Sequence, residues 1–136
     1  MPRTIVLELA ESQAEALDRV ALSLHTTPTA ATALLMDEAL RHEQFPQVEF
    51  RDSPCGRQAY VTGSTLAVWE VVMVAEAYEL DPLATARHLE WAPARVEGVL
   101  SYYRAHRDQI DEAVAENDAI TPEQMKQSLP GSVCIA

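Results

Sequence analysis

Residues 81–95 read DPLATARHLEWAPAR, and this stretch decides the fold of the central part of the chain. Asp81 followed by Pro82 is typical of a helix start, because aspartate caps the first free N–H groups and proline needs no N–H at the first helical position. Pro93 begins a second helix in the same way, directly after a turn at residues 91–92. Two helices joined by so tight a turn predict a helix-turn-helix layout.

Helix and strand patterns extend from this stretch in both directions. Upstream, apolar residues at helical spacing predict a helix over residues 66–79, and two β-prone segments at 48–51 and 58–61 predict a small ribbon. Downstream, one long helix is expected from Pro93 to residue 116. The side of this helix that faces the protein comprises Val96, Val99, Leu100, Tyr103, Arg107, Ile110 and Val114.

The N-terminal part of the chain has a pattern of its own. Residues 4–9 alternate as a β-strand does, and a helix is expected to follow with Ser12 and Glu15 as its capping box. A second helix is expected to start at Thr27 as N-cap, with Pro28 at the first helical position.

This N-terminal part carries more apolar surface than it can cover. Ile5, Leu7 and Leu9 share one face of the expected strand, and apolar residues spread around much of the second helix. A unit this small cannot bury such a helix by itself, which predicts a homodimer. The residues expected in its interface are Ile5, Leu7, Leu34 and Leu35.

Length and composition limit the fold class. The 136 residues suffice for one ordinary domain or two very small ones, and 48% hydrophobic with 23% charged residues is the balance of a globular protein. Only 6% aromatic residues and four glycines argue against a glycine-rich β-sandwich or a phosphate-cradling loop enzyme. A mainly α protein is therefore expected.

Charge and termini indicate the compartment and constrain the partners. The formal net charge is −11, so nucleic-acid binding would need a local basic patch, built from nine arginines and Lys126. The N-terminus resembles no secretory signal, and no apolar run approaches the roughly 20 residues of a membrane span. We expect a cytoplasmic protein without membrane contact.

Residues that could support catalysis or metal binding are scattered. Cys55 and Cys134 lack the spacing of a disulfide framework or zinc site, and no two histidines fall three or four residues apart. The acidic residues near the end of the long helix, namely Asp108, Asp111, Glu112, Glu116 and Asp118, are interpreted as a solvated face. No nucleophile has a recognisable base partner, so we expect no enzyme, no cofactor and no metal.

The order strand, helix, helix over residues 4–42 resembles the ribbon-helix-helix fold of the Arc, MetJ and CopG repressors. This resemblance implies that two chains pair their strands and present the outward side chains to the major groove of DNA. The outward positions here would be Thr4, Val6 and Glu8. Of these only Thr4 suits DNA contact, since Glu8 would place a negative charge against phosphates.

Residues 48–117 resemble the bacterial domain of unknown function 433, a homeodomain-like helix-turn-helix module of VapB-type antitoxins. The resemblance is carried by GR at 56–57, VTGSTLAV at 61–68, DP at 81–82, YY at 102–103 and RDQID at 107–111. The chain departs from the usual family pattern with Gln58, where proline is common, and Thr65, where arginine is common.

The expected DNA contacts are Thr4, Arg57, Arg87 and Arg95, with Arg95 at base edges and Arg57 and Arg87 at phosphates. The alternative is that these three arginines are surface residues that pair with Asp52, Glu90 and Glu97. Met125, Leu129, Val133 and Ile135 of the tail could anchor a toxin, and a simple docked or frayed C-terminus is the alternative.

Together these observations predict three parts: a ribbon-helix-helix-like dimerisation unit at 1–46, a helix-turn-helix module with a small β-ribbon at 47–118, and a tail at 119–136. As the resemblance implies, the function expected is that of an antitoxin of a bacterial type II toxin-antitoxin pair. It would neutralise a cognate toxin, such as a small ribonuclease, and repress its own operon by binding operator DNA. The alternative is a dimeric interaction or scaffold protein that does not bind DNA.

Overall fold

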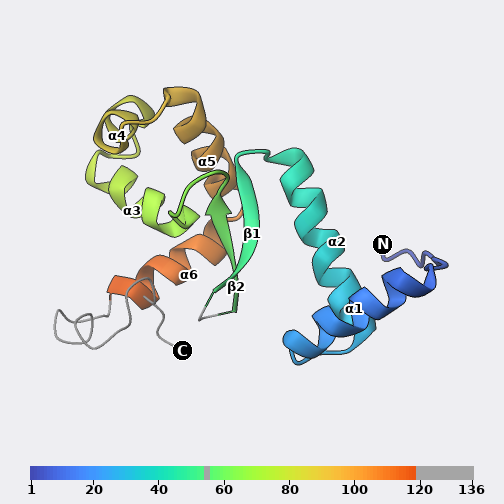
Figure 1. Ribbon diagram of the computed structural model, residues 1–136. Helices are drawn as coiled ribbons and strands as arrows, with labels where there is room; N and C mark the ends of the chain where they lie inside the picture. Colours follow the sequence, from blue (N-terminus) through green and yellow to red (C-terminus); the bar gives the residue numbers. More distant parts are fainter. Residues whose placement is uncertain (54–55, 119–136) are drawn as a thin grey trace. The chain divides into compact units, whose positions relative to one another are not determined.

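A computed structural model describes residues 1–53 and 56–118 (Figure 1). The described residues are mainly helical, as the composition predicted, and contain one two-stranded antiparallel sheet. In chain order the elements are α1 (Glu11–Ser23), α2 (Pro28–Gln44), β1 (Val48–Ser53), β2 (Gly56–Val61), α3 (Val68–Ala77), α4 (Pro82–Leu89), α5 (Pro93–Ala105) and α6 (Arg107–Asp118). None of the helices in this described part is long and apolar enough to cross a membrane.

The chain divides into two compact units, Met1–Ala39 and Leu40–Ala136, which we call the N-terminal and C-terminal units. The division falls inside α2, whereas the sequence placed a boundary after residue 46. The last turn of α2 belongs with the C-terminal unit because Arg41 Nη1 donates to Gln109 Oε1 (2.9 Å) and the His42 ring nitrogen Nδ1 lies 2.6 Å from the Val48 carbonyl oxygen.

In the N-terminal unit, one of the two predicted helix starts is confirmed. Thr27 caps α2, with its Oγ1 accepting from the Ala30 N–H (3.1 Å). The Ser12 capping box is wrong, because α1 already begins at Glu11 and Gln13 Oε1 accepts from the Ala10 N–H (2.9 Å). Ser12 therefore lies inside the first turn of the helix.

The predicted strand at residues 4–9 is not present in the single chain. Residues 1–10 form no regular secondary structure, and Ile5 and Leu7 are 74% and 58% exposed. A single strand has no neighbour to accept and donate its backbone hydrogen bonds. The extended conformation of residues 4–9 is therefore not stabilised until a second strand pairs with it.

The predicted ribbon is confirmed. β1 and β2 pair antiparallel in the register Val48–Val61 to Ser53–Gly56, and an isolated bridge joins Tyr60 to Ala67. Val48 and Val61 face each other in a fully buried pair at the end nearest the helices.

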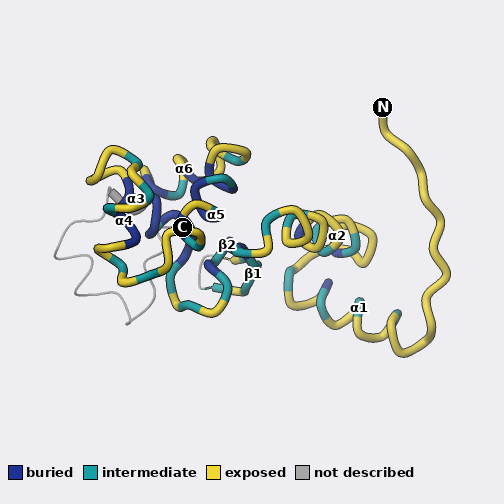
Figure 2. The backbone as a smooth tube through the Cα atoms, turned by 90° about the horizontal axis from the view of Figure 1, so that it is seen from above, coloured by how far each residue is buried: buried dark blue, intermediate teal, exposed yellow. Residues whose placement is uncertain are grey.

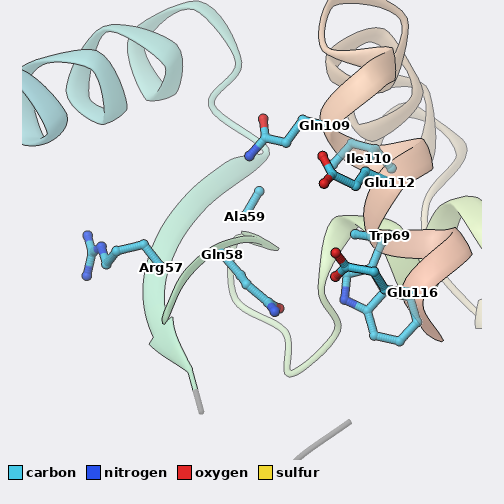
Figure 3. A pocket seen from close by; sticks show the side chains of 9 residues that line it. Arg57, Gln58, Ala59, Trp69, Gln109, Ile110, Glu112 and Glu116 are labelled. Carbon is cyan, nitrogen blue, oxygen red and sulfur yellow. The ribbon is translucent and has the colours of Figure 1, made fainter. Parts of the chain in front are cut away.

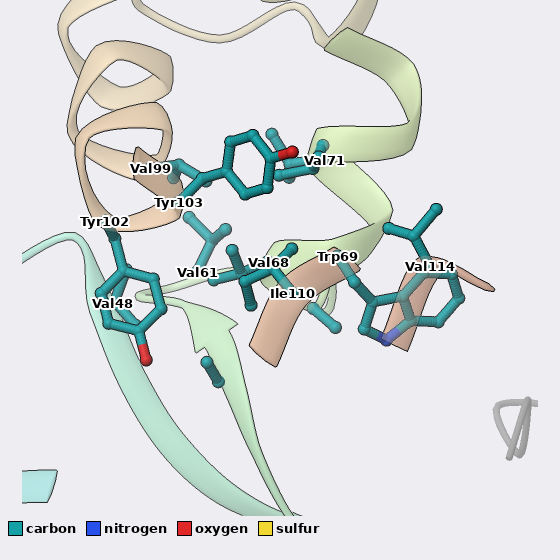
Figure 4. Packing of buried hydrophobic residues seen from close by; sticks show 13 residues of the cluster. Val48, Val61, Val68, Trp69, Val71, Val99, Tyr102, Tyr103, Ile110 and Val114 are labelled. Carbon is teal, nitrogen blue, oxygen red and sulfur yellow. The ribbon is translucent and has the colours of Figure 1, made fainter. Parts of the chain in front are cut away.

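Two adjoining apolar clusters form the core of the C-terminal unit. The larger joins the ribbon to α3, α5 and α6 through residues such as Val61, Val68, Val99 and Tyr102 (Figure 4). The smaller packs α4 between α3 and α5 and contains Ala75, Ala86, Val96 and Leu100. Figure 2 shows this contrast between the units: buried residues concentrate in the C-terminal unit, whereas α1 and the first ten residues are largely exposed.

The start of α4 also follows the prediction. The Asp81 carboxylate accepts from the Leu83 N–H (3.3 Å), with Pro82 at the first helical position. Glu90 ends α4 in the left-handed conformation (φ 59°), and α5 begins at Pro93. The tight turn between the two helices is therefore present.

The single long helix predicted from Pro93 to residue 116 is wrong. The chain turns at His106 (φ −130°, ψ 44°), whose N–H is shared between the carbonyl oxygens of Tyr102 (3.0 Å) and Tyr103 (3.2 Å). A straight helix rises about 1.5 Å per residue and would carry Val114 about 12 Å past the bend. The bend instead brings Ile110 and Val114 into the core against α3.

Candidate functional site

Arg95, the residue expected to read base edges, is held within the fold. Its Nη2 donates to the Thr62 carbonyl oxygen (2.6 Å), and its guanidinium carbon lies 4.2 Å from the centre of the Trp91 ring. The side chain thus connects the first turn of α5 to the turn after β2. The Arg95 guanidinium is therefore engaged within the C-terminal unit.

The two expected phosphate contacts, Arg57 and Arg87, lie in different surroundings. Arg57 Nη1 is 3.2 Å from Asp52 Oδ1 across the ribbon, which is the pairing that the alternative interpretation described. Arg87 is exposed on the last turn of α4. Thr4 is exposed in the N-terminal segment. Of the predicted DNA contacts in the C-terminal unit, Arg57 and Arg95 are therefore engaged within the chain, and Arg87 is exposed on α4.

A cleft of about 200 Å³ lies between β2 and α6, with Arg57, Trp69, Glu112 and Glu116 among the residues that line it (Figure 3). Figure 3 shows Arg57 on the side of β2 and the carboxylates of Glu112 and Glu116 on the side of α6. In the described ranges no group of three or more His, Cys, Asp or Glu side chains could hold a metal ion. The cleft offers a mixed polar surface and no recognisable reacting group.

An apolar groove of about 460 Å³ lies between α1 and α2 in the N-terminal unit. Its lining is almost entirely apolar and comprises Leu9, Gln13, Ala16, Leu17, Val20, Thr32, Leu35, Met36 and Ala39. In these two helices only Ala21, Ala31 and Glu38 are buried. Of the predicted interface residues, Leu35 lines the groove, Leu34 is half-buried, and Ile5 and Leu7 are exposed. A helical pair with so small a core has apolar surface left to bury against another molecule.

The YY and RDQID motifs hold the bend between α5 and α6. Tyr102, fully buried, accepts from Arg41 Nη1 (3.1 Å) and packs edge-on against Phe45, with ring centroids 5.3 Å apart. The Tyr103 hydroxyl donates to Asp111 Oδ1 (2.5 Å), and the Arg107 guanidinium lies 5.3 Å from the Tyr103 ring centre.

The hydrogen bond from Tyr103 to Asp111 also changes the acidity of the tyrosine. It raises the pKa of Tyr103 above its usual value of 10, and burial of the ring adds to the increase. The Arg107 guanidinium acts in the opposite direction. The neutral phenol is therefore the form that the folded protein favours.

A basic cleft at the same bend was missed by the sequence reasoning. It has a volume of about 370 Å³ and is lined by Arg41, Arg104, Ala105, His106, Arg107, Asp108 and Gln109. Arg104 and Arg107 are close in sequence, but Arg41 comes from α2. No sequence pattern connects residues so far apart, so only the packing of α2 on the bend could reveal the cluster.

Comparison with known proteins does not identify the chain. No protein-family model, curated protein or solved structure matches it. The resemblance to antitoxins therefore stays a prediction from the sequence. The expected toxin anchors Met125, Leu129, Val133 and Ile135 lie outside the described residues.

Proposed function

We propose that this chain is a homodimeric antitoxin of a bacterial type II toxin-antitoxin pair, which acts in the cytoplasm by binding and not by catalysis. It would bind a cognate toxin, such as a small ribonuclease, and regulate its own operon. The observation that carries the proposal is the apolar surface of the N-terminal unit, which consists of the groove between α1 and α2 and the exposed segment at residues 4–9.

The proposed dimer would supply two things that a single N-terminal unit does not have: a partner strand for residues 4–9 and a cover for its exposed apolar surface. Residues 4–9 have β-strand alternation, but no strand among the described residues pairs with them. In a paired ribbon Ile5, Leu7 and Leu9 would lie on one face. Leu9 already lines the groove between α1 and α2. Two copies could therefore pair their strands and cover both the ribbon face and the neighbouring helices, which is how a unit with so small a core becomes stable.

Support for regulation by DNA binding comes from the C-terminal unit. α3, α4 and α5 pack as three helices with a tight turn between the last two, as in a helix-turn-helix module. Arg87 is exposed on α4 and available to a phosphate. A homodimer would contain two copies of this three-helix module.

A second function, a dimeric interaction protein without DNA binding, is favoured by one specific observation. Arg95 and Arg57, two of the expected contacts, already bind Thr62 and Asp52 within the chain. The net charge of −11 also means that the chain as a whole repels a polyanion.

Light scattering coupled to size exclusion tests the dimer with a matched pair of variants. Leu7→Glu should halve the mass of the dimer, because a charge in the ribbon face has no partner there. Val6→Glu makes the same change on the opposite face, at a residue 86% exposed, and should leave the dimer intact. A wild-type mass of 15.0 kDa at micromolar concentration would refute the dimer.

The toxin and the operator need separate experiments. A tagged full chain expressed from its own locus should retain a small protein in near-stoichiometric amount after nuclease treatment, and the chain ended after residue 118 should lose it. Fluorescence anisotropy with a duplex of its own promoter separates the two functions. Specific, salt-sensitive binding supports the regulator, and no binding at low salt supports the interaction protein.

A further inference from the structure

The basic cleft at the bend between α5 and α6 concentrates positive charge in a molecule that is otherwise acidic. Arg41, Arg104 and Arg107 are three of the ten cationic side chains of the chain, and Asp108 is the one carboxylate among the cleft's lining residues. The cleft is therefore locally cationic, although the whole chain carries a net charge of −11.

The cleft is built on a rigid support. Arg41 is positioned by hydrogen bonds from Nη1 to the Tyr102 hydroxyl (3.1 Å) and to Gln109 Oε1 (2.9 Å). The His106 ring packs on Tyr102 with centroids 4.6 Å apart, and the Tyr102 ring is fully buried. Arg41 and His106 are thus held by the core, and little side-chain entropy remains to be lost when an anion binds.

The two remaining guanidinium groups are exposed at the edge of the cleft. Arg104 Nη2 donates to Ser101 Oγ (3.3 Å), and Arg107 lies over the face of the Tyr103 ring. Guanidinium groups present paired N–H donors that match the oxygens of a phosphate group. Three of them around one cleft favour a phosphate over a simple halide ion.

The exposure of the residues around the cleft indicates whether the bound phosphate group belongs to a small molecule or to a polymer. Arg104, Arg107, Asp108 and Gln109 are all exposed, so a small ligand would stay largely in solvent, whereas small-molecule sites bury most of their ligand. A phosphate group within a longer polymer would gain further contacts outside the cleft. The nucleic-acid backbone has this chemistry.

We propose that the cleft formed by Arg41, Arg104, His106 and Arg107 binds a phosphate group of the DNA backbone. The identity of the polymer rests on the proposed function, whereas the anion site itself rests on the cleft alone. This assignment adds a phosphate contact at the bend after α5, whereas Arg57, one of the two phosphate contacts expected from the sequence, is paired with Asp52.

A charge-reversed variant with a matched control tests the proposal. Arg104→Glu changes an exposed side chain that donates to Ser101, and Arg19→Glu makes the same change at an exposed residue of α1 that belongs to neither proposed contact surface. Circular dichroism first establishes that both variants are folded. Anisotropy with a labelled promoter duplex is then measured over a salt titration. Arg104→Glu should weaken binding about tenfold and reduce the salt slope by about one, and Arg19→Glu should change both much less.

Inorganic phosphate provides the second arm, read by backbone amide shifts in NMR. Phosphate should shift the amides of residues 104–109 in the wild type and not in Arg104→Glu. If the duplex does not bind but these shifts occur, the anion site stands and the DNA-binding part of the proposed function fails. If the duplex binds equally well to Arg104→Glu, or if neither probe perturbs residues 104–109, the assignment of the cleft is overturned.

Discussion

Replacement of Arg95 by alanine should destabilise the C-terminal unit whether or not the protein binds DNA. The guanidinium donates to the Thr62 carbonyl oxygen at 2.6 Å and lies 4.2 Å from the Trp91 ring centre. Alanine removes both contacts and leaves the Thr62 carbonyl without this donor. The first turn of α5 would lose its connection to the turn after β2.

The expected magnitude follows from these two contacts. A hydrogen bond from a charged group contributes about 1.5–3 kcal/mol, and a cation–π contact at a partly exposed site contributes about 0.5–1 kcal/mol. Because Arg95 is half-buried, solvent weakens both, and we expect a loss of about 2 kcal/mol in the free energy of unfolding. With a urea dependence of roughly 1–3 kcal/mol per molar, the unfolding midpoint should fall by about 1 M.

Urea denaturation followed by circular dichroism measures this shift, with Arg87→Ala as the control. Arg87 carries the same charge and is exposed on α4, so its removal should change the free energy of unfolding by no more than about 0.5 kcal/mol. If Arg95→Ala were as stable as Arg87→Ala, the interpretation of Arg95 as a structural residue would be refuted. A loss of DNA binding in that stable variant would then restore Arg95 as a direct contact.

Three further changes test the packing of the C-terminal unit. Gly98→Ala should destabilise it by about 1–3 kcal/mol in urea denaturation, because an added Cβ would lie 2.6 Å from Gln47 Cγ; a more stable variant would contradict this close approach. The pKa of Tyr103 is raised in the folded protein, so on increasing pH the unfolded chain loses its phenol proton first. The free energy of unfolding should therefore stay constant up to about pH 10 and decline above it. Tyr103→Phe should lose that alkaline decline, and an unchanged pH profile would contradict the hydrogen bond to Asp111. Asp81→Ala should cost about 1 kcal/mol through the lost cap of α4, measured by thermal unfolding, and no change in the melting temperature would show that the cap is dispensable.

Local chemistry made several elements predictable from the sequence. The starts of α2 and α4 depend on a cap side chain within three residues and a proline beside it, as at Thr27 and Asp81. The ribbon depends on two β-prone segments around a short turn. In each case the interacting groups are close in sequence, so the pattern alone carries the information.

The candidate site depended on contacts between distant residues. Arg95 bonds to a carbonyl 33 positions away, and Arg41 reaches Tyr102 and Gln109 across 61 and 68 positions. No proline or glycine near His106 predicts the bend from the sequence. The bend forms because it allows Ile110 and Val114 to be buried against α3. Sequence patterns therefore defined the helices, the ribbon and the surplus apolar surface, whereas core packing alone decided which arginines are held inside the fold and which meet at one cleft.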